Sequence, residues 1–562
     1  MFNVDDLLAV AMLPSDRSAD WLRGATSAVD YLVKNMRSGE VIIYTNAGQA
    51  LTHSVLAPRA GVTPPDGDVL QQTQIDPYAH WALEHVSGGG QPDRMYLSPP
   101  VDSYGCKALE GAEQLVFRRQ FTGVDKGHPR TELSQPLVQA LDLYWLDEES
   151  AYCKLDEDGD IEPVIRLRDL SAKTNEPGAM LVTIKAEALH RYMAVTETVL
   201  VTRFDFTRFI IGSFGGWSEP TRSEVNKDDL FYHGGIQANG SFVNGALILR
   251  PVLTKAMLIG KARRNWDQAD KQYAVFKAHD WKNDNLAEIS CAPSDLASYF
   301  EPDSPLPFQT TPAFFRPDVL LKYKSDPEKY RLEHRSIHAR GGWYLKTYDV
   351  NEAGQVHTYL CYLADLPYKE QLYWQSFNEW PKAPISRRAK QTDFDGDFSS
   401  EPDPLEHVKY EISKLDGLKP AYWQSRGETL RQAVHYPLTA SVEEWSNAIL
   451  ALDQLVVEGF ATRPLRKRLT DAGRTFDKQW GTLKLLQDVL IAGGLDEDEA
   501  ADIMMPLRTT HELRSKTKGH AAESEKAALV KKAKTDHGSL PAHFRALVTG
   551  IQESFDRLIE LL

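Results

Sequence analysis

Apolar residues recur every three or four positions in the last third of the chain, which is the spacing of one face of an α-helix. One such stripe is formed by Val442, Trp445, Ile449, Leu452 and Val456. Ser441 and Glu444 form a predicted capping box at its start, and Gly459 follows its end. Further helices are predicted at Pro464 to Ala472, Thr482 to Ala492, Leu495 to Met505, from Leu507 onward as a separate helix, and from Ser539 and Pro541 to Leu562.

Short runs of β-branched and aromatic residues, separated by turn residues, dominate the chain before residue 398. Strands are predicted at Val41 to Thr45, Gln114 to Phe121, Asp142 to Leu146, Ala151 to Leu155, Val164 to Arg168, Leu181 to Lys185, Thr198 to Phe204, Phe242 to Leu249, Trp343 to Tyr348 and His357 to Leu363. An amphipathic helix is predicted at Ser18 to Met36 and another helix at Asn265 to His279. This pattern favours mainly antiparallel sheets.

The composition changes after Asp397, where the segment Ser399 to Pro404 has the character of a linker. We therefore predict a multidomain α+β protein, in which a large strand-rich region precedes an all-α helical bundle. The expected domains are residues 1–215, residues 216–398, which may form one unit with the first, and residues 405–562.

Composition narrows the possible classes of protein. The net charge of −15 excludes a surface that attracts nucleic acid everywhere, although a local basic patch can still do so. Four widely spaced cysteines form neither a zinc motif nor a disulfide framework. The N-terminus has no signal-peptide pattern, and the longest apolar tract is interrupted by Arg250 and Lys255. We expect a cytoplasmic protein without a membrane span.

The most specific chemical pattern lies at Leu507 to His520, where Arg514 and Ser515 precede His520. RNA is cleaved by its own 2′-hydroxyl when a base removes that proton and a cation stabilises the charge that develops on the phosphate. Histidine titrates in the range needed for proton transfer, and arginine offers fixed charge and a forked set of donors. Lys516 and Lys518 would attract the RNA backbone.

Arg514 and His520 do not share one face of an ideal helix, because six residues at about 100° each place them about 120° apart. They converge only if the helix bends or ends near Gly519, or if two protomers form a composite site. The alternative is that both side chains lie on a solvated helix face.

A terminal helical domain with Arg514, Ser515 and, five residues further, His520 resembles the HEPN superfamily. The long strand-rich front also resembles Apea-type proteins of bacterial antiphage defence. This resemblance implies a metal-independent RNase site that two protomers build, with Arg514 on the scissile phosphate, His520 in proton transfer and Ser515 orienting one of them. It requires no metal and no cofactor.

Other motifs favour structural roles. Three alternating carboxylates in Asp156 to Asp160 resemble half of a calcium loop, but Leu167 stands where a bidentate glutamate is needed. A hairpin turn is the preferred interpretation there, and also for Asp393 to Asp397. Phe377 to Arg388 is aromatic and basic. This composition is equally compatible with a segment that binds a ligand or a nucleic-acid strand and with a loop that covers the strand-rich body.

Two basic runs concentrate positive charge in the helical domain, although such runs are usually solvated helix faces. They comprise Arg463, Arg466, Lys467 and Arg468, and Lys526, Lys531, Lys532 and Lys534.

Together with this resemblance, the sequence suggests an N-terminal sensing region, with a phage-derived or small-molecule trigger. That region would regulate a C-terminal endoribonuclease that acts on RNA as a homodimer or higher oligomer. The alternative is a non-catalytic binding protein whose helical domain serves dimerisation.

Overall fold

The computed structural model describes most of the chain. The described residues are 3–11, 18–47, 50–62, 81–98, 109, 111–120, 123, 129–209, 221–237, 240–266, 271–333, 335–397, 403–518 and 523–562. They form two units, one of Met1–Asp156 with Ile161–Asp270, and one of Glu157–Asp160 with Lys271–Leu562. Of the expected linker Ser399 to Pro404, residues 399–402 lie outside the described residues, and Asp403 and Pro404 begin the first helix of the helical region.

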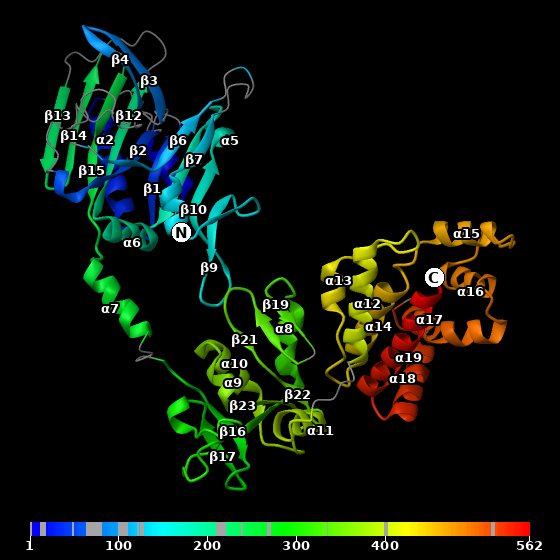
Figure 1. Cartoon of the computed structure of the whole chain (residues 1–562). Helices are drawn as coiled ribbons and strands as arrows, with labels where there is room; N and C mark the ends of the chain where they lie inside the picture. Colours follow the sequence, from blue (N-terminus) through cyan, green and yellow to red (C-terminus); the bar gives the residue numbers. More distant parts are fainter. Residues whose placement is uncertain are drawn as a thin grey trace. The chain divides into compact units, whose positions relative to one another are not determined.

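The first unit is built on a long antiparallel sheet with the strand order β13-β14-β15-β12-β2-β1-β11-β10-β9-β8, and β5 pairs with β2 (Figure 1). Its strands are β1 (Glu40–Ala47), β2 (Ala50–Pro58), β5 (Glu113–Gln114), β8 (Tyr144–Leu146), β9 (Ala151–Leu155), β10 (Ile161–Asp169), β11 (Met180–Lys185), β12 (Thr198–Phe209), β13 (Thr221–Lys227), β14 (Leu230–Gln237) and β15 (Gly240–Leu249). Because β12 pairs with β15, the sheet continues across residue 215.

Two hairpins and several helices complete this unit. The hairpins are β3 (Ala82–Gly88) with β4 (Gln91–Ser98) and β6 (Val116–Arg119) with β7 (Arg130–Leu133). The helices are α1 (Val4–Ala11), α2 (Ser18–Met36), α4 (Gln135–Ala140), α5 (Ser171–Thr174), α6 (Ala186–Thr196) and α7 (Lys255–Trp266).

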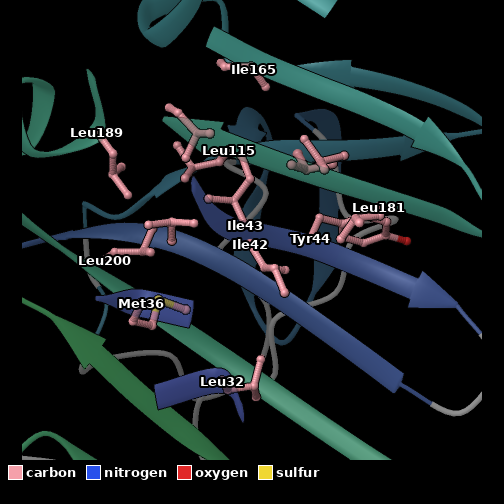
Figure 2. Packing of buried hydrophobic residues seen from close by; sticks show 14 of the residues in the cluster. Leu32, Met36, Ile42, Ile43, Tyr44, Leu115, Ile165, Leu181, Leu189 and Leu200 are labelled. Atoms are coloured by element: carbon pink, nitrogen blue, oxygen red, sulfur yellow. The ribbon is translucent and has the colours of Figure 1, made fainter. Parts of the chain in front are cut away.

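Helix α2 packs against β1, β14 and β15, as its amphipathic pattern predicts. Figure 2 shows Leu32 and Met36 of α2 near Ile42 of β1 and Leu200 of β12, and all four side chains are buried. Each fully buried side chain of this size contributes about 1.5–3 kcal/mol of transfer free energy, so this contact anchors α2 on the sheet.

The second unit begins with small sheets and short helices. Its strands are β16 (Val275–Asp280), β17 (Asn285–Ser290), β18 (Pro312–Phe315), β19 (Tyr330–Leu332), β20 (Ile337–Ala339), β21 (Tyr344–Leu345), β22 (Asp349–Val350), β23 (Val356–Tyr359) and β24 (Asn378–Glu379). The helices of this part are α8 (Leu321–Ser325), α9 (Leu360–Ala364), α10 (Tyr368–Phe377) and α11 (Arg387–Ala389).

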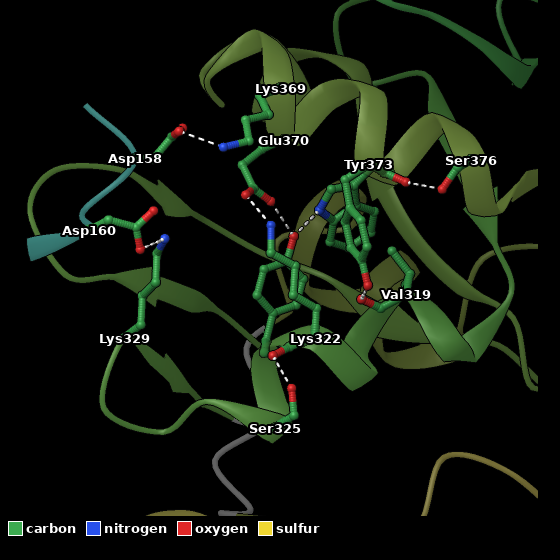
Figure 3. Close-up of polar contacts among 12 residues, drawn as sticks. Asp158, Asp160, Val319, Lys322, Ser325, Lys329, Lys369, Glu370, Tyr373 and Ser376 are labelled. Atoms are coloured by element: carbon green, nitrogen blue, oxygen red, sulfur yellow. Dashed lines mark hydrogen bonds and ion pairs between the residues drawn. The ribbon is translucent and has the colours of Figure 1, made fainter. Parts of the chain in front are cut away.

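A polar network surrounds the buried Glu370 of α10 (Figure 3). Its carboxylate pairs with Lys322 and accepts a 2.8 Å hydrogen bond from the hydroxyl of Tyr323. Trp374 Nε1 in turn donates to that hydroxyl at 2.8 Å. The acid therefore has a cation and a donor that offset the cost of its burial.

The turn Glu157–Asp160 belongs to this second unit, although β9 and β10 on either side belong to the first. Asp158 pairs with Lys369 at 2.7 Å, and Asp160 pairs with Lys329 at 2.5 Å (Figure 3). Arg340 Nε donates to the Gly159 carbonyl at 3.1 Å. The segment between β9 and β10 is a hairpin turn, as predicted.

The rest of the second unit is helical, which confirms the predicted fold class of a strand-rich, antiparallel N-terminal region followed by a helical C-terminal region. Its helices are α12 (Pro404–Leu418), α13 (Glu428–Ala433), α14 (Val442–Val456), α15 (Thr462–Asp471), α16 (Thr482–Ala492), α17 (Glu497–Lys518), α18 (Glu523–His537) and α19 (Leu540–Leu561). The predicted stripe of α14 is buried except at the half-buried Val442, and the helix packs against α17 and α19. Ser441 caps the helix by accepting from the Glu444 amide.

Several element predictions are wrong. The hairpin turn expected at Asp393 to Asp397 is not formed, because Lys390–Phe394 is a short π-helix and the next described element along the chain is a helix. The helix expected at Asn265 to His279 is absent, because α7 ends at Trp266 and β16 begins at Val275. Burial alternates in that strand, with Phe276 and Ala278 inside. Of the strand expected at Trp343 to Tyr348, only the two residues of β21 are in a strand. Of the strand expected at His357 to Leu363, the part up to Tyr359 belongs to β23 and the part from Leu360 belongs to helix α9.

The predicted helix break before Leu507 is also wrong, because α17 runs without interruption through Pro506. Met504 and Leu507 are fully buried on either side of the proline. Burying both side chains offsets the hydrogen bond that proline cannot donate. Among the helices of the described ranges, none has the length and apolar character needed to cross a bilayer.

Candidate active site

Helix α17 carries the candidate site along the edge of its buried stripe. The stripe comprises Ala500, Met504, Leu507, Thr510, Leu513 and Thr517. The first turn contains Glu497, Asp498 and Glu499, and the last turn contains Lys516 and Lys518, so both ends complement the helix dipole. His511 and Arg514 adjoin the stripe and are three residues apart, so they lie side by side on the helix.

Both side chains reach Asp453 of α14, whose side chain is fully buried. His511 Nδ1 lies 3.0 Å from Oδ1 and 3.3 Å from Oδ2 of this aspartate. Arg514 Nε lies 3.8 Å from Oδ2. The imidazole and the guanidinium therefore share one buried carboxylate.

Glu458, just beyond α14, forms the outer edge of the cluster. Arg514 Nη2 donates to Glu458 Oε1 at 3.4 Å, and Arg426 Nη2 donates to Glu458 Oε2 at 2.9 Å. Arg514 is thus held by two carboxylates, which fixes the direction of its planar group.

Burial raises the pKa of Asp453, while His511 and Arg514 act in the opposite direction. The two basic side chains thus offset part of the cost of burying this carboxyl. When His511 Nδ1 donates to Asp453, Nε2 is the acceptor nitrogen of the neutral ring.

The cluster leaves two groups available for chemistry. His511 uses Nδ1 for Asp453, its side chain is 42% exposed, and within the described part of the chain its Nε2 makes no hydrogen bond. Arg514 uses Nε and Nη2, so the donors of Nη1 have no partner among the described residues. A histidine oriented by a buried acid beside an arginine with free donors is an arrangement suited to proton transfer at an anionic substrate.

Of the other site residues predicted from the sequence and described by the structure, only Ser515 contacts a residue of this cluster. Ser515 Oγ donates to the carbonyl oxygen of His511 at 2.9 Å. Lys516 pairs with Glu512 at 2.5 Å, and Lys518 is exposed in the last turn of α17. His520 lies outside the described residues.

His511 and Asp453 were not among the residues predicted from the sequence. His511 stands within the motif stretch, three residues before Arg514. Asp453 follows Leu452 directly and lies one turn after Ile449 on a largely buried helix face. An acid in such a position signals a buried partner, because unpaired carboxylates are rarely buried.

The acidic turn is the other candidate site. Oxygens of Asp156, Asp158 and Asp160 lie within 4.8 Å of one another. Asp158 pairs with Lys369 and Asp160 pairs with Lys329. The hydrogen bond from Lys329 is the main cause that lowers the pKa of Asp160. These lysines account for the cluster of carboxylates.

No protein-family model, curated protein or solved structure matches the chain.

Proposed function

We propose that the helical region is a metal-independent endoribonuclease, and that His511, oriented by Asp453, and Arg514 form its centre. The observation that carries this proposal is the shared contact of His511 Nδ1 and Arg514 Nε with the buried Asp453 carboxylate. The resemblance to HEPN domains in Arg514, Ser515 and His520 points to the same reaction class.

The reaction follows from the groups available. His511 Nε2 takes the proton of the ribose 2′-hydroxyl, and the 2′-oxygen attacks phosphorus while the bond from phosphorus to the 5′-oxygen breaks. Arg514 Nη1 donates to the phosphate oxygens as their charge grows. The 5′-oxygen leaves with a proton from a second carrier, and the products are a 2′,3′-cyclic phosphate and a 5′-hydroxyl.

We assign the second proton transfer to His520, with Ser515 as a positioning residue and Lys516 and Lys518 as contacts to the RNA backbone. The resemblance implies that two protomers build such a site, so the proposal includes a homodimer. Asp453 is a positioning residue, because it holds the imidazole and stabilises its charged form.

The proposal extends to the cellular role. The first unit would act as a sensor for a phage-derived or small-molecule trigger in a bacterial defence protein of the cytoplasm. The competing function is a non-catalytic one, in which the helical region only dimerises or binds a partner and the Asp453 cluster is a structural ion-pair group.

The test is incubation of the full-length protein with mixed RNA in EDTA. Wild-type protein should release 2′,3′-cyclic phosphate ends, and His511→Ala, Arg514→Ala and His520→Ala should each lose at least about 100-fold of the rate.

Matched controls are available in the same region. His407 Nε2 lies 2.8 Å from Asp556, and Arg557 pairs with Glu499 at 3.2 Å, so each repeats a contact type of the candidate site elsewhere. His407→Ala and Arg557→Ala should cleave like the wild type. Intact RNA with the wild-type protein, or equal losses in the control variants, would contradict the proposal and favour the non-catalytic function.

A further inference from the structure

A groove with positive side chains lies between the first turn of α14 and helix α18. It has a volume of about 740 Å³. Its lining consists of Val442, Glu443, Lys526, Ala527, Val530, Lys531, Lys534 and Thr535. Three lysines thus face a single carboxylate, that of Glu443, and the groove carries a positive charge on a chain with a net charge of −15.

The lysines of this groove differ from the many cations of the helical region that form ion pairs. Many of the latter are neutralised by acids, as in the pairs Lys409 with Glu406, Lys414 with Glu411, Arg431 with Asp416, and Arg557 with Glu499. In contrast, Lys526, Lys531 and Lys534 form no ion pair within the residues that the structure describes. Their charge is available to an external anion.

The spacing of the lysines defines an elongated site. Lys526 and Lys534 are eight residues apart on α18, which corresponds to about 12 Å along the helix axis. One nucleic-acid strand advances about 3.4 Å per nucleotide in a duplex, so this length corresponds to about three or four phosphates. The groove therefore suits a polyanion rather than a single small anion.

The chemistry of the lining separates RNA from other polyanions. The three lysines of the lining can attract backbone phosphates as point charges, which needs no fixed geometry of the anion. Val442 and Val530 are half-buried and give the groove an apolar component. Unpaired bases can contact such a surface, while the bases of a duplex are stacked inside it.

We propose that the groove formed by Lys526, Lys531, Lys534, Val442 and Val530 binds the sugar–phosphate backbone of single-stranded RNA. It is distinct from the Asp453 cluster, and this proposal stands on binding alone, whether or not the cluster cleaves RNA.

The test uses the full-length protein and a fluorescent 2′-O-methyl oligonucleotide of about 12 nucleotides. This probe has no 2′-hydroxyl and cannot be cleaved by the proposed reaction, so binding is measured apart from catalysis. Fluorescence anisotropy in EDTA at several salt concentrations gives Kd and its salt dependence.

The variant Lys526→Gln/Lys531→Gln/Lys534→Gln should bind at least about tenfold more weakly in 0.1 M salt. Its slope of log K against log salt should be smaller by about 2, since each lost phosphate contact removes about 0.7. The charge-matched variant Lys414→Gln/Lys419→Gln/Lys478→Gln replaces exposed lysines outside the groove and should match the wild type.

The following results would overturn the proposal: no binding by the wild type in low salt, equal Kd and slope in the groove variant and the wild type, or equal losses in the two triple variants. Displacement of the probe by polyglutamate as efficiently as by unlabelled RNA would assign the groove to acidic peptides. Equal displacement by duplex RNA would refute the preference for single strands. Circular dichroism spectra of both triple variants should be those of the wild type, because the substituted side chains are exposed or half-buried.

Discussion

At the scale of single residues, Asp453 has the most consequential environment in the helical region. Its side chain is fully buried, and the two basic side chains that face it, His511 and Arg514, are both partly exposed. Burying a carboxylate in this way costs free energy that packing alone does not require. The cost is reasonable where the acid orients groups that act on a substrate.

Asp453→Asn tests this role. Asparagine keeps the shape of the side chain but removes the carboxylate charge that faces His511 as its ring takes up a proton in the reaction. If the cluster cleaves RNA, kcat should fall by at least about 100-fold while KM changes little, because the interaction acts in the transition state. Asp556→Asn, which alters the other His–Asp pair of the region, should leave kcat unchanged. A change in KM alone would contradict the positioning role.

A second residue-scale prediction concerns His357 of β23, which is 2% exposed. Its Nε2 accepts a hydrogen bond from the Ser386 amide at 3.0 Å. Burial lowers the pKa of His357 to about 4; among the charged groups around it, Asp349 and Asp393 raise that pKa, while Arg388 and Arg335 lower it. The folded state therefore binds fewer protons than the unfolded chain, in which histidine has a pKa of about 6.5.

Stability should consequently fall as the pH drops below about 6.5, and the loss that His357 contributes between pH 7.5 and pH 5 should be about 2 kcal/mol. His357→Gln keeps an acceptor but cannot titrate, so its unfolding free energy should fall less over the same interval. Denaturant titrations at both pH values measure this difference. Parallel losses in the wild type and the variant would contradict the assignment.

At the scale of elements, the most accurate predictions from the sequence are those of helices with a single apolar stripe. The periodicity of α14, α16 and α19 is a local property, and their boundaries lie close to the predicted ones. The helix predicted at residues 265–279 is wrong at its end, where Val275–Asp280 forms a strand with alternating burial. This alternation covers only six residues, so in the sequence the helical pattern before it dominates. The helix end predicted before Leu507 is wrong because the packing of α17 outweighs the tendency of Pro506 to end a helix.

The candidate site shows the same limit. The sequence identifies Arg514 through a short motif, but Asp453 lies 61 residues away on another helix, and their meeting depends on how α14 and α17 pack. Spacing within one segment carries no information about such a contact. The stripe of α14 nevertheless indicates that Asp453 is unusual.

Gly459 provides an element-scale prediction. It follows α14, but its role is to make room for Trp423, since a Cβ atom there would lie 2.4 Å from the indole ring. Trp423 is 6% exposed and packs against Phe460 and Phe555. Gly459→Ala should therefore lower the unfolding free energy by about 1–3 kcal/mol.

The control is Gly417→Ala in the last turn of α12, where a Cβ atom meets nothing within 4 Å. Alanine is the better helix former, so this change should be neutral or stabilise by up to about 1 kcal/mol. Chemical denaturation compares the two variants. Equal stability of both would show that Trp423 moves aside without cost.

At the scale of the whole molecule, the second unit includes a turn from the middle of the first. Gly159 in this turn has φ +77°, and a Cβ atom there would lie 1.8 Å from the Arg340 carbonyl oxygen. Gly354, in a turn of the same unit, has φ +76° and nothing within 4 Å. The two glycines thus share a backbone conformation but not a neighbour.

Gly354→Ala should cost about 1–2 kcal/mol, the strain of a left-handed residue. Gly159→Ala should cost at least about 2 kcal/mol more, because the turn must also move away from Arg340. Both changes should lower the same calorimetric transition, that of the second unit. Equal shifts in the two variants would contradict the close approach at Gly159.

The place of this turn also sets an order of events during synthesis. Asp158 is translated 211 residues before its partner Lys369. A ribosome that adds about 5–20 residues per second needs about 10–40 s to cover that distance. The turn therefore leaves the ribosome long before its lysines exist, and the second unit cannot be completed from its own contiguous segment alone. The turn Glu157–Asp160 of the second unit is synthesised early, as the tip of the β9–β10 hairpin. It has to remain accessible until residue 369 has been translated.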